Sequence, residues 1–560
     1  MAEEELRPCG LVMKGGVTSG VVYPGAIKAL SGRYWFTDVG GTSAGAIAAA
    51  VTAAAEYGRR GGDPAARGFA ALDDVAQELG ESGRLLDLFQ AAEPVRPLLD
   101  AGLAGVRAGG GVLGAVAAVR VLLRRRPAIV AGAVAAALLV LAAAVLAVLS
   151  APVGVALLVC LVLAPLALAA VAGGVAAALL AHVRRIAARL PESGFGMCPG
   201  TRQPGYAAEE ALTEWLHRHI QAAAGLPLDQ PLTFAMLAQR EIRMEVMTTD
   251  LGAGEPRRLP LETPDYLFDR DDMAALFPPT VVAALAAGQE GAPPGVLLSM
   301  PTQDLPVLVA TRLSLSFPVL LSAVRLHARH TERLDVVETW LSDGGIASNF
   351  PIHFFDAWIP RFPTFGLDLR PAGAERAGGT RWTSVETTGR FLHQVLDTMQ
   401  NWRDTMQAGL PGYHDRVAPV ALAAGEGGLN LQMGPEAIAD LMARGATAGE
   451  QLLREFDWDR HRFLRYLTLM QLLETDLHAA SPAFAVWGPE LARGVPASAR
   501  DFLSGHDEAW CRAAAAATQG LFDVAAAWGA EPAPALGFAR GVEPQPTPAM
   551  KVAPRAGPAT

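Results

Sequence analysis

The sequence predicts an α/β protein: a three-layer core, an inserted transmembrane helical hairpin and a mostly helical C-terminal extension. Two observations predict this. Residues 11–30 and 34–57 each begin as an apolar, strand-like run, pass through a glycine-rich turn and continue in helix-forming residues. Residues 127–181 contain no charged side chain, whereas core helices of that length normally carry a polar face.

The composition narrows the class of protein. A length of 560 residues allows two to four domains. The chain is 51% hydrophobic and only 18% charged, which is too apolar for an ordinary soluble protein. A net charge of -10 lacks the basic surplus of a nucleic-acid binder. The acidic N-terminus has no apolar segment typical of a secretory signal peptide. Four scattered cysteines, without metal-site spacing, favour a reduced, cytosol-facing protein, and we expect neither metal nor cofactor.

The charge-free run at 127–181 is long enough for two membrane helices, since each needs about 20 apolar residues. Proline and glycine at 150–154 suit a turn between them. Arginines flank both ends of the run: Arg120, Arg124, Arg125 and Arg126 before it, and Arg184, Arg185 and Arg189 after it. The positive-inside rule places both ends in the cytoplasm, which predicts a multi-pass protein with two helices and a cytoplasmic core. A pair of buried core helices is the alternative.

The stretch Gly41-Thr42-Ser43-Ala44-Gly45 lies between the predicted strand and helix of 34–57. Strand, tight turn and helix form the context of a nucleophile elbow, in which the serine takes a strained backbone conformation and projects its hydroxyl. The flanking glycines relieve crowding, and the helix N-terminus favours a developing anion. The alternative is a chance match in a chain with 58 glycines.

Two further motifs accompany this serine. The loop at Gly15, Gly16 and Val17 follows an apolar strand, and its backbone N–H groups, with that of Ala44, would form an oxyanion hole. A plain turn or a nucleotide phosphate loop is the alternative, but the GxxxxGK[ST] pattern is absent. Far downstream, Asp343 is followed by Gly344 and Gly345 at the end of an apolar run; an ordinary Asp-Gly turn is the alternative there.

In this order, the three motifs make the chain similar to a bacterial, membrane-anchored member of the patatin-like phospholipase family. The resemblance covers residues 10–126 and 195–370. It implies a Ser43 nucleophile, Asp343 as proton acceptor in a two-residue dyad, and a lipid acyl hydrolase that cleaves carboxylic esters of membrane glycerolipids. It assigns the motif glycines Gly41, Gly45, Gly344 and Gly345. The expected partners are the phospholipid substrate and the bilayer.

The predicted boundaries follow from these motifs. Residues 8–126 and 195–370 form the two parts of the core, 127–181 the hairpin, 371–530 the helical extension and 531–560 a disordered tail rich in proline and alanine. Because Ser43 and Asp343 must meet in one site, the chain between them must cross a membrane an even number of times.

Three other functions stay open at this point. An α/β-hydrolase would use a triad with a histidine such as His353, although that fold needs more strands before its elbow. A catalytically inactive, membrane-anchored interaction protein is favoured by the unusual Val17 and Ser19 in the glycine loop. An acyltransferase would use the same acyl-enzyme.

Overall fold

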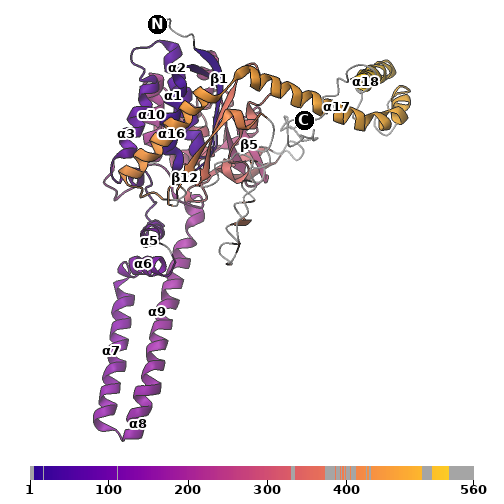
Figure 1. Cartoon of the computed structure of the whole chain (residues 1–560). Coiled ribbons are helices and arrows are strands. Elements are labelled where there is room, and N and C mark those ends of the chain that lie inside the picture. Colours follow the sequence, from indigo (N-terminus) through magenta and orange to yellow (C-terminus); the bar gives the residue numbers. More distant parts are fainter. Residues whose placement is uncertain are drawn as a thin grey trace.

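A computed structural model describes residues 6–528 except 17, 110, 330–334, 411, 424, 428–429, 495–506 and most of 373–410. Val17 and the predicted tail at 531–560 therefore lie outside the described residues. Within the described residues the chain is a mixed α/β protein with a central sheet, abundant helix and two long apolar helices (Figure 1). This confirms the predicted α/β class and the presence of an apolar helical pair.

The central sheet has ten strands in the order β12-β11-β1-β2-β4-β10-β9-β6-β7, with β5 paired to β4 off this path. The strands from β12 to β4 run parallel to their neighbours, whereas β10 is antiparallel to β4. The strands are β1 (Arg7–Met13), β2 (Tyr34–Gly41), β4 (Arg243–Asp250), β5 (Glu255–Leu259), β6 (Tyr266–Phe268), β7 (Leu298–Ser299), β9 (Val324–Arg329), β10 (Val336–Asp343), β11 (Thr364–Pro371) and β12 (Val417–Leu422). A separate pair joins β3 (Gly196–Cys198) and β8 (Val319–Leu321).

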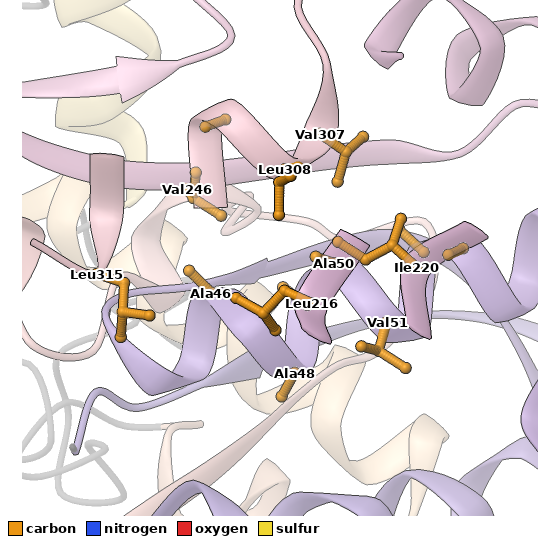
Figure 2. Close-up of a cluster of buried hydrophobic side chains, with 14 of the residues drawn as sticks. Ala46, Ala48, Ala50, Val51, Leu216, Ile220, Val246, Val307, Leu308 and Leu315 are labelled. Carbon is orange, nitrogen blue, oxygen red and sulfur yellow. The ribbon is translucent and has the colours of Figure 1, made fainter. Parts of the chain in front are cut away.

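Helices pack on one face of this sheet around α2, which is almost entirely buried. Its alanines leave room for neighbouring helices: Figure 2 shows Ala46 and Ala50 beside Leu216 and Ile220 of α10, with Leu308 of α14 close by. These helices are α1 (Tyr23–Ser31), α2 (Ala44–Gly61), α3 (Ala71–Gly80), α10 (Leu212–Ala224), α14 (Val307–Ser314) and α16 (Pro435–Glu455). Shorter helices are α4 (Arg84–Asp87), α11 (Phe234–Gln239), α12 (Arg270–Ala274) and α13 (Pro279–Leu285).

The opposite face carries a second, smaller apolar cluster. In β1, Leu11 belongs to the large cluster and its neighbour Val12 to the small one, as expected when successive side chains point to opposite faces of a sheet. The small cluster also contains Phe350, Ile352 and Tyr413. The sheet is therefore covered on both faces in the described part of the chain.

The apolar run forms two long helices that extend away from the core (Figure 1). The first is α7 (Pro127–Ser150); the second continues from α8 (Val153–Leu158) through a π-helical turn into α9 (Ala164–Ala187). Both are long and apolar enough to cross a membrane, and neither candidate span is buried in the protein. The second helix runs beyond the predicted limit at 181, and its last turns bury His182 and Ile186.

The region predicted as a separate helical extension at 371–530 is partly core. Strand β12 pairs in parallel with β11, and α16 packs against α1. The α1–α16 contact is close because glycines form it: a Cβ at Gly445 would lie 1.9 Å from the Val22 carbonyl oxygen. Within the described part of 371–530, α17 (Trp458–Leu491) and α18 (Glu508–Trp528) reach beyond the core (Figure 1).

Candidate active site

Ser43 lies in the turn between β2 and α2, with φ 56° and ψ -127°. A positive φ is uncommon for a residue with a Cβ and indicates strain that the surrounding structure must hold. The motif glycines hold it by close packing: a Cβ at Gly45 would lie 2.2 Å from the Met13 carbonyl oxygen, and one at Gly41 would lie 2.3 Å from the Gly45 carbonyl oxygen. The sequence therefore folds here as a sharp strand-to-helix turn.

Asp343 ends β10, and the sheet brings it to Ser43. Gly41 pairs with Val246 of β4, and Asp343 pairs with Thr248, two residues further along the same strand. Gly344 permits this approach, since a Cβ there would lie 2.1 Å from the Met247 carbonyl oxygen. Residues that are 300 positions apart in the sequence thus meet at one point of the sheet.

The Asp343 carboxyl is buried, and this burial raises its pKa to about 6. The Ser43 hydroxyl, as a hydrogen-bond donor, and the Gly345 N–H act in the opposite direction. The Gly345 N–H donates to Oδ1 at 2.7 Å, whereas Oδ2 accepts no hydrogen bond of standard geometry from the described residues. Oδ2 is thus the buried carboxyl oxygen that remains open to a further hydrogen bond, and the role of Asp343 as proton acceptor stays a prediction.

The predicted oxyanion hole needs one correction. The Gly15 N–H donates to the Asn349 carbonyl oxygen at 2.7 Å, so it is not available to an oxyanion in this structure. Gly15 is instead required by space, because a Cβ there would lie 2.1 Å from Oδ1 of Asn349. Ala44 is the first residue of α2, where backbone N–H groups have no intrahelical acceptor, so its role stays a prediction. So does that of Gly16, whereas Val17 lies outside the described residues.

Four supporting residues, Ser314, Ser348, Asn349 and Asp404, were not assigned a role from the sequence. Ser314 Oγ accepts the Ser43 N–H at 3.2 Å. Asp404 accepts hydrogen bonds from Ser348 Oγ and the Asn349 N–H, both at 2.9 Å. Burial raises the pKa of Asp404 to about 6. Asp404 therefore holds the segment after Asp343, and through Asn349 it is linked to the glycine loop. Nothing in the local sequence around these residues signals such a role.

A narrow apolar cavity of about 70 Å³ adjoins the nucleophile turn. Ala44, next to Ser43, lines one side of it together with Thr18 and Gly20 of the glycine loop. The remaining lining residues are almost all apolar and include Ile27, Val51, Leu72, Val75, Leu79, Leu85, Leu88, Phe89, Leu212 and Trp215. An apolar chain attached to a group at Ser43 fits the chemistry of this lining.

The surroundings of the Asp343 carboxyl, of His353 and of possible metal ligands bear on which groups could take part in the reaction. Among the described residues, Ser43 and Gly345 are the groups whose hydrogen bonds act on the Asp343 carboxyl. His353 packs edge-on against Phe354, with ring centroids 5.0 Å apart. In the described part of the chain, no group of three or more His, Cys, Asp or Glu side chains is placed to hold a metal ion.

Fold and site together define a mixed α/β protein that brings a strained serine against a buried carboxyl and carries two membrane-length apolar helices. The chain is 34% identical, over 572 aligned positions, to a protein named RpoH suppressor from Rhizobium meliloti (strain 1021). The alignment covers 85% of this chain and 87% of that protein, and the chain belongs to the same family. No family model matches the chain.

Proposed function

We propose that the protein is a membrane-anchored, patatin-like lipid acyl hydrolase that acts through a Ser43–Asp343 dyad. The observation that carries the proposal is the serine at positive φ facing a buried carboxyl whose pKa is about 6. A general base is most effective when its pKa lies near the operating pH, and a free aspartate at about 3.9 is far from it. At pH 7 most Asp343 side chains are ionised, and the carboxylate is more basic than in water.

The reaction proceeds in two steps. Ser43 Oγ attacks the ester carbonyl carbon while its proton passes to Asp343. The tetrahedral oxyanion forms beside the N-terminus of α2, whose first residue, Ala44, has no intrahelical acceptor for its N–H. The intermediate collapses to an acyl ester on Ser43, and Asp343 returns the proton to the departing alcohol. Water then gives its proton to Asp343 and attacks the acyl ester. The fatty acid leaves, and the proton returns to Ser43.

Two features support a membrane glycerolipid as substrate. The apolar cavity beside Ala44 suits an acyl chain. The helices α7 and α9 expose apolar side chains along their whole apolar length, and burial of such surface in a bilayer is favourable by about 25 cal/mol per Å². A hairpin anchored in the bilayer would hold the site where acyl esters are concentrated.

The same features support a cytoplasmic orientation. Both ends of the hairpin join one core, so the hairpin would enter and leave from the same face of the membrane. The arginines that flank it lie at that end, and the positive-inside rule assigns such an end to the cytoplasm.

Acyl release from phospholipid vesicles by the purified full-length protein tests the proposal. We expect release by the wild type, loss to background in Ser43→Ala and Asp343→Asn, and retention in His353→Ala. Loss in His353→Ala comparable to that in Ser43→Ala would instead indicate a triad. Release unchanged in Ser43→Ala would refute the proposal.

A catalytically inactive interaction protein is the second candidate, because the Gly15 N–H is occupied by the Asn349 carbonyl oxygen. Under this candidate, wild type and Ser43→Ala would both fail to release acyl groups from any lipid tested.

A further inference from the structure

The helix α6 (Gly111–Arg124) has one packed face and one uncovered face. Its packed face meets α5 (Arg96–Arg107) through two glycines: a Cβ at Gly114 would lie 2.7 Å from the Gly105 carbonyl oxygen, so the two backbones are nearly in contact. On the other side, Val112, Leu113 and Val116 are 81%, 73% and 51% exposed. Large apolar side chains grouped in this way mark an interaction surface.

The position of α6 indicates the partner. Figure 1 shows α6 lying across the core-proximal end of the hairpin, and the helix is joined to α7 by a short turn. If α7 and α9 cross a bilayer, α6 lies at the level of the lipid head groups. A helix with an apolar face and basic residues lies in the plane of the interface, with its apolar side chains among the upper acyl chains.

The charge of the sequence around α6 indicates which class of lipid it would bind. Residues 101–191 contain no Asp or Glu, in a chain whose net charge is -10. They contain eight arginines: Arg107, Arg120, Arg124, Arg125, Arg126, Arg184, Arg185 and Arg189. Arg125 pairs with Asp100, whereas Arg120 and Arg124 on α6 form no ion pair with the described residues. A cationic belt on an otherwise acidic protein complements an anionic surface.

We propose that α6 and these arginines, which we term the α6 platform, bind anionic phospholipid head groups at the membrane surface, away from the substrate at Ser43. This inference rests on the proposed insertion of the hairpin, but not on hydrolysis. The platform holds the core at a fixed height above the bilayer. Each arginine near an anionic surface contributes about fivefold in local affinity, the equivalent of about 1 kcal/mol.

Depth-dependent fluorescence quenching tests the position of α6. Cys160, half-buried in the hairpin, is replaced by alanine, since the other cysteines are buried. A bimane probe is then placed by Val116→Cys on α6, by Leu139→Cys at the middle of α7, or by Leu228→Cys on the core; all three side chains are more than half exposed. The full-length protein is reconstituted with lipids that carry a spin label near the head group or near the acyl methyl end.

The expected pattern is specific to each position. The probe at 116 is quenched most by the shallow label, the probe at 139 most by the deep label, and the probe at 228 by neither. Quenching at 139 without quenching at 116 would overturn the platform and leave the inserted hairpin intact. Absence of quenching at 139 would overturn the insertion itself, and the platform with it.

Lipid selectivity tests the arginines. With a probe at 116, spin-labelled phosphatidylglycerol is expected to quench several-fold more effectively than spin-labelled phosphatidylcholine at equal mole fraction. Arg120→Gln with Arg124→Gln removes two of the eight arginines and should reduce this preference several-fold, while quenching by phosphatidylcholine persists. The matched control, Arg454→Gln with Arg462→Gln, removes the same charge from exposed positions on α16 and α17 and should retain it. Equal quenching by both lipids in the wild type would overturn the assignment of anionic head groups.

Discussion

Ser43 occupies a backbone conformation that glycine adopts freely and serine adopts only under strain. The strain is maintained by contacts that do not involve the hydroxyl: the Ser314 Oγ accepts the Ser43 N–H, and Gly45 lies against the end of β1. Such strain typically costs 1–3 kcal/mol and is found where function requires a side chain to project.

Replacing Ser43 by glycine should therefore stabilise the fold, whereas replacing it by alanine should not. We expect the free energy of unfolding of Ser43→Gly to be about 1 kcal/mol higher than that of Ser43→Ala. The difference is smaller than the full strain because glycine is also more flexible in the unfolded chain. Thermal unfolding of both variants in detergent measures the difference. Equal melting temperatures would mean that the turn is not strained.

The raised pKa of Asp343 suits its proposed role as a base and lowers the stability of the folded protein at neutral pH. Its pKa is raised from 3.8 to about 6 by burial, so the folded protein binds an extra proton between these two values. The resulting stabilisation is complete below about pH 4 and is lost as the pH rises through about 6. The ionised carboxylate at neutral pH is thus held at an energetic disadvantage of up to about 3 kcal/mol.

Acyl hydrolysis should accordingly rise with pH through a midpoint near 6, because only the ionised carboxylate accepts the Ser43 proton. Asp343→Asn should lose activity yet unfold at a higher temperature than the wild type at pH 8, with the difference shrinking at pH 4. Rate profiles and melting curves across this range measure both effects. An activity that is flat between pH 5 and pH 8 would contradict the assigned role of Asp343.

The candidate site could be predicted from the sequence only in part. Ser43 and Asp343 each lie in a short motif whose glycines are required by local geometry, so local sequence reveals them. Asn349 and Asp404 have no such motif, because their role comes from contacts with the glycine loop and with each other in three dimensions. The hydrogen bond that occupies the Gly15 N–H was not foreseen for the same reason: its acceptor, the Asn349 carbonyl oxygen, is distant in sequence.

At the scale of elements, backbone contacts between segments that are distant in sequence determine which segments belong to the core. In the sequence, β12 begins 46 residues after the end of β11, and α16 follows it. Neither the hydrophobic pattern nor the length of these two segments distinguishes them from a peripheral extension. Their assignment depends on pairing with β11 and packing on α1, which are nonlocal contacts. The units β1–α1 and β2–α2 were predictable because each strand is followed along the chain by a glycine-rich segment and then by helix-forming residues.

The α1–α16 contact gives a direct test of this assignment. A methyl group added by Gly445→Ala would meet the Val22 carbonyl oxygen, so the helices must separate and the free energy of unfolding should fall by about 1–3 kcal/mol. Gly520→Ala in α18 is the matched control, since this glycine is also helical and no atom lies within 4 Å of the new methyl group. Melting temperatures that are equally affected would show that α16 is not packed on the core.

At the scale of the whole molecule, the hairpin can be read from local sequence, whereas its arrangement relative to the core cannot. The place of the hairpin was predictable because a charge-free run of that length is long enough for two membrane-crossing helices, although its second helix continues to Ala187. Its arrangement relative to the core depends on α5, α6 and the end of α9, none of which has a strong sequence signal. We therefore expect that membrane attachment by the hairpin and ester hydrolysis by the core can be separated.

Replacing residues 129–180 by a short Gly/Ser linker should separate the two functions. The ends of α7 and α9 near the core are adjacent, so the linker need not distort the sheet. Hydrolysis of a water-soluble short-chain ester should persist, while release from vesicles should fall at least tenfold because the site is no longer held at the bilayer. Parallel loss of both activities, in a variant that retains the wild-type circular dichroism of its core, would contradict this separation.

The most direct test of the central claim is mass-spectrometric mapping of a fluorophosphonate adduct on the full-length protein. Fluorophosphonates react with serines activated by a neighbouring base, and the adduct mimics the tetrahedral intermediate. We expect one dominant adduct, on Ser43, that is absent in Ser43→Ala and forms at least 100-fold more slowly in Asp343→Asn. An unmodified Ser43 in folded wild-type protein, or an adduct of equal rate in Asp343→Asn, would contradict the Ser43–Asp343 dyad.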